Sequence, residues 1–198
     1  MPKVVAEYRE QAKGRILGAA LRVFSEKGYH ETSMENIAQA LGVSKGALYL
    51  YFGSKEELFE AICEPGPQIL RETLLSLFKD ADLVRDAEAF FDAALKEANP
   101  GLNFEILAEA SRNVALRKVL KKNYDNTLDV VTGLLRDQKE KGRIRQDLDA
   151  DLLARSLVAV YQGFLAGFVI GVDKLELKRA WIELLKPLTY GPTRKLPI

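Results

Sequence analysis

Cysteine and histidine each occur only once among the 198 residues, as Cys63 and His30. A single cysteine excludes an internal disulfide, and a single histidine excludes a histidine-rich metal centre. A Ser/His/Asp or Cys/His catalytic set would have to be built on His30 alone, which we interpret as a turn residue. Cys63 is interpreted as a small core residue. We therefore expect no metal, no cofactor and no catalytic residue.

Net charge is also nearly absent, because 29 Lys and Arg residues are balanced by 28 Asp and Glu residues. This balance excludes a uniformly basic nucleic-acid coat protein, so only a local patch could bind a polyanion. The charge is nevertheless uneven. Residues 1–55 hold eight basic and five acidic side chains, whereas residues 56–198 hold 21 and 23. Binding to nucleic acid is therefore expected within the first 55 residues.

Long hydrophobic runs are missing as well. Residues 156–172 carry no charge, but they number 17, and a membrane-spanning helix needs about 20. The segment also contains Gln162 and three glycines, so we expect a helix buried on most of its circumference and no membrane span. The amino terminus is polar where a secretory signal would be apolar. A cytoplasmic location is the resulting expectation.

Apolar residues recur at helical spacing along nearly the whole chain, and no alternating strand pattern is apparent. Thr32 and Glu35 form a predicted capping box at the start of one helix, and Ser54 and Glu57 form another. Glycine and proline separate the periodic segments. The sequence predicts an all-α fold of about nine helices.

Two short helices are predicted at 33–40 and 44–50, joined by a turn that contains Gly42. Helices joined by such a turn cross steeply, as in a helix-turn-helix. The second helix, SKGALYLY, would expose small residues, two tyrosines and Lys45. Small side chains let the backbone approach a base edge, and tyrosine hydroxyls reach phosphates. The alternative is structural, with half-buried packing tyrosines and ordinary solvated lysines.

More than twenty residues of this region occur in one register without a gap: Gly28-Tyr29, Thr32-Ser33-Met34-Glu35-Asn36-Ile37-Ala38, Leu41-Gly42-Val43-Ser44-Lys45-Gly46-Ala47-Leu48-Tyr49 and Tyr51-Phe52-Gly53-Ser54-Lys55-Glu56-Glu57-Leu58. This pattern closely resembles the tetracycline-repressor (TetR) family, and the resemblance covers about residues 10–62. It implies an Ω-shaped homodimer that places the second helix of each motif in the major groove of DNA. The rest of the chain matches the family only in length and helical character.

Carried over by position, the resemblance implies DNA contacts for Thr32, Ser33, Ser44, Lys45, Gly46, Ala47, Tyr49, Tyr51 and Lys55. The family often has Tyr-His where this chain has Leu50-Tyr51, and Tyr51 can donate to a phosphate but cannot carry a charge. Capping competes with DNA contact for the hydroxyl of Thr32. The implied domains are residues 1–55 for DNA binding, with the motif at about 33–52, and residues 56–198 for effector binding and dimerisation.

A dimer interface is predicted on the last two helices, which form a four-helix dimer bundle in the family that the chain resembles. The glycines of the uncharged segment recur every four residues and make a smooth stripe that suits a tight helix crossing. The predicted interface residues are Gly163, Gly167, Gly171, Trp181 and Leu184. In the alternative, the glycines only accommodate a neighbouring helix of the same chain.

The resemblance also implies an effector cavity among the central helices. Its candidate lining residues are Phe90, Phe91, Phe104, Leu107, Tyr124, Leu128, Tyr161, Phe164 and Phe168. Plain core packing is the alternative for most of them. If they do line a pocket, their aromatic character favours an apolar or aromatic small molecule.

The predicted function is a ligand-responsive transcriptional regulator, a repressor that a small molecule releases from a palindromic operator. Its expected partners are double-stranded DNA with an inverted repeat, a second copy of the chain and a small-molecule effector. Two alternatives remain at this point. One is a carboxylate-based helical enzyme that uses Glu105 and Glu109, which lie one helical turn apart. The other is a helical adaptor that binds only protein.

Overall fold

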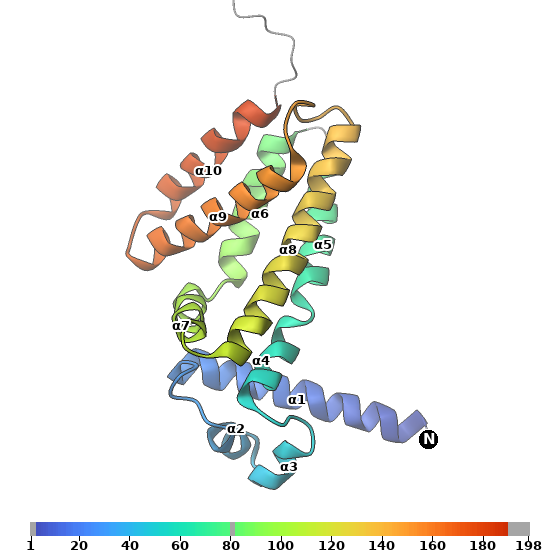
Figure 1. The fold of residues 1–198 in the computed structure, drawn as a ribbon, viewed down its shortest axis with the longest axis vertical. Coiled ribbons are helices and arrows are strands. Elements are labelled where there is room, and N and C mark those ends of the chain that lie inside the picture. Colours follow the sequence, from blue (N-terminus) through green and yellow to red (C-terminus); the bar gives the residue numbers. More distant parts are fainter. Residues whose placement is uncertain (1–2, 80–81, 190–198) are drawn as a thin grey trace, which may run out of the picture. The chain divides into compact units, whose positions relative to one another are not determined.

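The computed structural model describes residues 3–79 and 82–189, and every regular element within those ranges is an α-helix (Figure 1). The helices are α1 (Lys3–Lys27), α2 (Met34–Leu41), α3 (Lys45–Tyr49), α4 (Lys55–Cys63), α5 (Gly66–Leu77), α6 (Leu83–Glu97), α7 (Pro100–Ala110), α8 (Val114–Glu140), α9 (Ala150–Val169) and α10 (Lys174–Thr189). The predicted all-α fold is confirmed. The described residues contain ten helices where about nine were expected, and α4 and α5 are separated by only two residues at Glu64 and Pro65.

The chain divides into two compact units. Unit 1 comprises the residues up to Gly66 together with Gly101–Asn123, and unit 2 comprises Pro67–Pro100 together with the residues from Tyr124 onward. Helix α7 and the first part of α8 therefore pack with the amino-terminal helices. The predicted boundary between residues 55 and 56 separates DNA binding from effector binding and dimerisation. The outer ends of the two predicted domains, residues 1 and 198, lie outside the described residues. That functional boundary stays a prediction.

The core of unit 1 is organised around three aromatic rings from α1, the loop after it and α4. Phe24 and Tyr29 have ring centroids 5.1 Å apart, and Phe59 stands edge-on to Tyr29 at 5.6 Å. Leu48 of α3 and Leu116 of α8 are completely buried in the same cluster. Helix α3 is held from one side, because Leu48 is the one buried residue of this short helix.

The start of α2 corrects one prediction. Ser33, and not Thr32, is the N-cap: its Oγ accepts a hydrogen bond from the Asn36 N–H at 3.2 Å. The Ser33 N–H in turn donates to Oδ1 of Asn36 at 3.0 Å, so Asn36 takes the place expected for Glu35. The hydroxyl of Thr32 instead donates to the Gly28 carbonyl oxygen at 2.6 Å. The predicted cap at Ser54 is present, with the Glu57 N–H donating to its Oγ at 3.0 Å.

The core of unit 2 joins α6, α9 and α10 through aromatic residues. Trp181 is buried, and its Nε1–H donates to the Ala87 carbonyl oxygen at 3.0 Å. Its ring lies edge-on to those of Tyr161 and Phe164, at 6.5 and 6.2 Å. On the surface beside it, the Lys178 ammonium joins α10 to α6 through Glu88 and Asp92. Figure 1 shows α10 running beside α9.

Helix α9 does not meet the expectation that it is buried on most of its circumference. It is long and apolar enough to cross a membrane by length and composition, yet only 11% of its most apolar window is buried within the chain. Leu152 and Ile170, near its two ends, are among the most exposed large apolar residues. The contacts within the chain thus leave an apolar face of α9 exposed.

Candidate DNA-binding surface

Helices α2 and α3 form the predicted helix-turn-helix. Gly42 adopts a left-handed conformation with φ of 71°, and its N–H donates to the carbonyl oxygens of the last turn of α2. This conformation favours glycine because other residues carry a Cβ that clashes there. Ser44 then caps α3, since its Oγ accepts from the Ala47 N–H at 3.2 Å. The turn and the cap fix the direction in which α3 leaves the domain.

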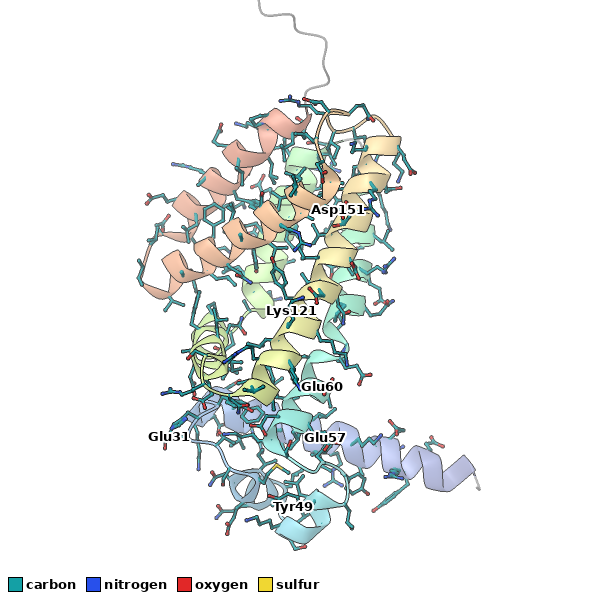
Figure 2. All side chains as sticks on the ribbon, in the orientation of Figure 1. Glu31, Tyr49, Glu57, Glu60, Lys121 and Asp151 are labelled. Atoms are coloured by element: carbon teal, nitrogen blue, oxygen red, sulfur yellow. The ribbon has the colours of Figure 1, made fainter. Side chains whose placement is uncertain are left out.

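The outer side of α3 is well exposed. Leu48 is completely buried, whereas Tyr49, labelled in Figure 2, is 45% exposed. Lys45 is also exposed, and its Nζ lies 3.9 Å from a carboxylate oxygen of Glu35 on α2. Such an exposed ion pair is weak in water and can be exchanged for another anion. These side chains are free to meet a ligand as large as DNA.

The other predicted contact residues differ in how far they are exposed. Ser33, Ser44 and Gly46 are exposed. Ala47 and Tyr51 are half-buried, and Tyr51 packs against the core of unit 1. Thr32 is 2% exposed with its hydroxyl turned toward the Gly28 carbonyl, so its side chain is not available to a phosphate. For Thr32, the structure supports an internal role in the loop that precedes α2.

Lys55 is used inside the subunit. Its Nζ donates to the carbonyl oxygens of Tyr29 at 2.7 Å and Thr32 at 2.9 Å, and it stands 4.4 Å from the centroid of the Tyr29 ring. Burial lowers the pKa of this amine, against the opposing effect of neighbouring carboxylates such as Glu56. In the free protein the Lys55 ammonium therefore holds the α1–α2 loop, residues 28–33, against the start of α4, and the phosphate contact expected for Lys55 stays a prediction.

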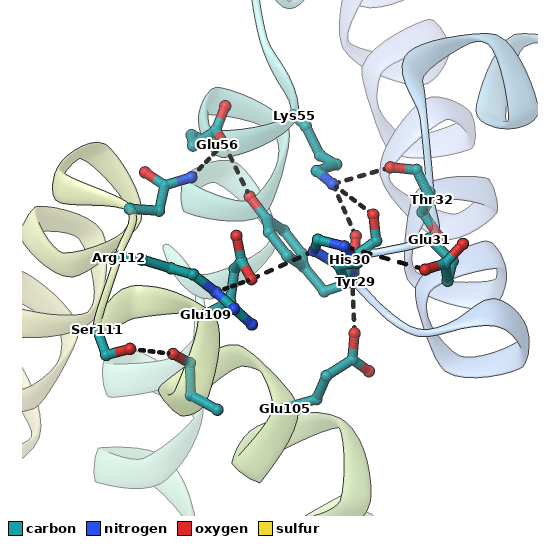
Figure 3. Close-up of polar contacts among 12 residues, drawn as sticks. Tyr29, His30, Glu31, Thr32, Lys55, Glu56, Glu105, Glu109, Ser111 and Arg112 are labelled. Carbon is teal, nitrogen blue, oxygen red and sulfur yellow. Dashed lines mark hydrogen bonds and ion pairs between the residues drawn. The ribbon is translucent and has the colours of Figure 1, made fainter.

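Two carboxylates from α7 hold the same loop (Figure 3). Glu105 accepts a hydrogen bond from the His30 backbone N–H at 2.7 Å. Glu109 lies 3.3 Å from His30 Nδ1 and pairs with Arg112 at 3.1 Å. The Glu105 carboxylate also fills the space beside Gly28, where an added Cβ would lie 2.6 Å from Oε2. Glycine therefore suits position 28 for two reasons. It tolerates the backbone φ of +83°, and it leaves room for the Glu105 carboxylate.

Glu56, at the start of α4, completes the network. Its Oε1 accepts from the Asn113 side chain at 2.8 Å and from the Tyr29 hydroxyl at 3.3 Å. Burial would raise the pKa of Glu56, but these hydrogen bonds outweigh it and leave the pKa below its ordinary value. Burial, with the nearby Glu56 charge, raises the pKa of Tyr29, so its phenol stays protonated. We call the network of Tyr29, His30, Lys55, Glu56, Glu105, Glu109 and Asn113 the loop clamp.

The loop clamp bears on the enzyme alternative. Glu105 and Glu109 do share one face of α7, as their spacing predicts, but both are engaged with the loop before α2. In the parts of the chain that the structure describes, no three His, Cys, Asp or Glu residues are placed to hold a metal ion. Burial raises the pKa of the Cys63 thiol to about 11, so this thiol stays protonated near neutral pH. The carboxylate pair thus has a structural role in unit 1.

The candidate effector residues fall in both units. In unit 2, Phe90 and Tyr161 have ring centroids 6.2 Å apart, as do Phe91 and Phe164. Tyr124 and Leu128 pack in a neighbouring apolar cluster. Phe168 is 40% exposed. In unit 1, Phe104 is half-buried and Leu107 is largely exposed on α7. Burial raises the pKa of Tyr161 to about 12.

The predicted interface residues also differ in placement. Gly163 and Leu184 are exposed, and nothing lies within 4 Å of the position of a Cβ at Gly163. Gly167 instead accommodates Leu177 of the same chain, whose Cδ2 would lie 3.1 Å from an added Cβ. Gly171 has a φ of 91° just after the end of α9. Trp181 is 5% exposed, which leaves it little surface to offer a second copy.

Sequence reasoning missed the loop clamp because its members are far apart in the chain. Gly28 follows α1 in a left-handed conformation. The carboxylate that packs on it, Glu105, comes 77 residues later. No local signal pairs the two. The sequence also does not show that the Lys55 side chain points into the subunit, because this direction depends on the same tertiary packing.

Comparison with known proteins gives two matches to family models. Residues 16–62 match the model described as bacterial regulatory proteins of the tetR family. Residues 81–186 match the carboxy-terminal domain of BetI-type transcriptional repressors. The first match covers the helix-turn-helix, and the second covers most of unit 2.

Individual relatives agree with the family models. The HTH-type transcriptional regulator UidR of Escherichia coli K12 is 31% identical, over 92% of this chain and 93% of its own length. An uncharacterised HTH-type transcriptional regulator of Bacillus subtilis, YfiR, is 34% identical over 73% of each chain. Among solved structures, Salmonella enterica GusR has a TM-score of 0.76 at 29% identity, covering 89% of this chain and 94% of its own. A regulator from Saccharomonospora viridis solved with choline has a TM-score of 0.71 at 21% identity, covering 89% and 96%, and shares the fold.

Proposed function

The chain belongs to the TetR family of bacterial transcriptional regulators, and from this premise we propose that a homodimer binds an inverted-repeat operator through α3 and is released by a small-molecule effector. Relatives that carry both parts of the chain are named as transcriptional regulators or repressors. The enzyme and adaptor alternatives are not favoured. Binding to chromosomal DNA would place the protein in the cytoplasm.

One observation carries the DNA contact: α3 is held by its caps and by Leu48, while Lys45 and Tyr49 project from it into solvent. Lysine contributes a phosphate contact that does not depend on sequence, and a tyrosine can reach either a phosphate or a base edge. Ser33, Ser44, Gly46, Ala47 and Tyr51 complete the proposed surface. The small residues of α3 let its backbone come close to the base edges in the groove.

The dimer is proposed to form through α9 and α10. Their exposed apolar residues include Leu152, Phe168, Ile170, Leu175 and Leu184. The smooth surface at Gly163 lets a helix of a second copy pack closely. A twofold dimer then presents two α3 helices, and these read half-sites about 34–36 Å apart or a multiple of that distance.

The effector is proposed to be an apolar or aromatic molecule that binds among the rings of Phe90, Tyr161 and their neighbours in unit 2. For the effector to release the protein from DNA, a coupling free energy must link the effector site to the DNA-binding surface, and this coupling is reciprocal. An effector that lowers operator affinity is therefore itself bound less tightly by the DNA complex.

DNA selection tests the proposal. The purified chain is incubated with a random duplex library at near-physiological salt, and the bound fraction is sequenced after several rounds. We expect an enriched inverted repeat, since a twofold dimer reads two equivalent half-sites. A folded dimer that enriches no sequence, even after refolding to remove a copurified effector, would contradict operator binding.

A further inference from the structure

Beside Lys45 and Tyr49, the outer side of α3 carries a strip without charge and without hydrogen-bonding side chains. Gly46, Ala47 and Leu50 are spaced three and four residues apart, so they share one side of the helix. Leu50 is the C-cap residue, and its φ of −68° and ψ of −19° continue the helical path. Leu48, on the opposite side, is completely buried. Lys45 and Tyr49 lie along a flank of the apolar face.

Leu50 stands out on this face because it is 77% exposed. A single exposed leucine is ordinary on a protein surface. This one, however, extends the helix that enters the DNA groove in the proposed function, beside the flank that carries Lys45 and Tyr49. In complex with DNA its side chain would leave water, and it would then contact whatever the groove offers at that depth.

The major groove offers one apolar group, the 5-methyl of thymine. The other exposed groups are hydrogen-bond donors and acceptors, and an aliphatic side chain pressed against them leaves them without a partner. An apolar face therefore favours thymine by attraction and disfavours the other bases by desolvation. Glycine and alanine at 46 and 47 add little bulk and let Leu50 reach the groove floor.

We propose that Leu50 is a specificity-determining residue that reads the methyl group of thymine in each operator half-site. The inference rests on the proposed function, because it needs α3 to lie in the major groove. It assigns a base preference to a residue outside the set that the family resemblance supplies. Methyl readout by Leu50 makes the operator affinity sensitive to a change that leaves every hydrogen bond of the DNA intact.

Deoxyuridine supplies that change, since it differs from thymidine only by the missing methyl. The selected operator is synthesised with deoxyuridine at the half-site thymines, and its Kd for the full chain is measured by fluorescence anisotropy. We expect the operator affinity to fall roughly fourfold when one buried methyl is removed, and about fifteenfold when both half-sites are changed. As the DNA control, deoxyuridine placed only in the spacer between half-sites should leave Kd unchanged.

The protein control is Leu50→Ala, whose fold is checked by an unchanged melting temperature. This variant should bind the thymine operator more weakly than the wild type and bind the thymine and deoxyuridine operators equally. Leu75→Ala, a matched substitution at an exposed leucine of α5, should retain the full deoxyuridine effect. Comparing the variants in this way isolates the coupling between Leu50 and the methyl group.

The outcomes separate the inference from the function beneath it. Selective operator binding with equal Kd for thymine and deoxyuridine would overturn methyl readout and leave the DNA-binding function standing. A deoxyuridine penalty that persists in Leu50→Ala would assign the methyl contact to another residue and overturn the role of Leu50. Absence of any selected operator would overturn both.

Discussion

Replacing both Lys45 and Tyr49 with alanine is expected to weaken operator binding about a thousandfold without changing the fold. Each side chain contributes roughly 1 kcal/mol through a phosphate or base contact, and a dimer makes each contact twice, for a total of about 4 kcal/mol lost. Both residues are exposed in the free protein. Their removal should therefore change the free energy of unfolding by less than about 0.5 kcal/mol.

The measurement is a Kd at several salt concentrations for the wild type, the two single variants and the double variant. Lys45→Ala should also reduce the slope of log K against log salt by about two, one phosphate contact for each subunit. Lys118→Ala, which removes an exposed lysine from α8 in the same unit, is the charge-matched control and should leave the slope unchanged. Wild-type affinity in the double variant would show that α3 is not the reading helix.

The substitution Lys55→Met is expected to destabilise unit 1 by about 2 kcal/mol. Methionine fills similar space, but the carbonyl oxygens of Tyr29 and Thr32 lose a charged donor, and hydrogen bonds to charged groups contribute about 1.5–3 kcal/mol. The loop before α2 would then be held by the α7 carboxylates and by the hydrogen bond from the Tyr29 hydroxyl to Glu56. Operator affinity should fall as well, because the position of α2 and α3 depends on that loop.

Chemical denaturation followed by circular dichroism measures this loss, with Lys45→Met as the matched control. The control removes an equivalent charge from an exposed side chain and should leave the unfolding midpoint nearly unchanged. If Lys55 were instead a solvent-facing phosphate ligand, the two variants would be equally stable and only DNA binding would differ. That result would restore the interpretation drawn from the sequence.

The helix-turn-helix could be predicted because its signals are local. A glycine in the left-handed region at 42, serine caps at 44 and 54 and a buried leucine at 48 all act within a few residues of themselves. The cap of α2 was misplaced by one residue because Thr32 and Ser33 are both capping residues. Only packing decides which hydroxyl turns inward, and here that of Thr32 does.

The direction of Lys55 and the roles of Glu105 and Glu109 could not be predicted in the same way. A lysine beside a helix start fits a phosphate contact and an internal clamp equally well in the sequence. Contacts across 75 residues, such as that of Glu105 with His30, are set by tertiary packing. The exposure of α9 was missed for a related reason, since composition alone does not tell whether an apolar face is covered within a subunit or by a second one.

The most direct test of operator binding by a dimer is the stoichiometry of the complex. The wild-type chain is titrated onto the selected inverted repeat and onto a duplex that carries one half-site, and the mass of each complex is measured alongside its Kd. We predict two chains on each inverted repeat and at least about a hundredfold weaker binding to the half-site, because only the full repeat engages both α3 helices. One chain on the inverted repeat, or equal affinity for the two duplexes, would contradict the account.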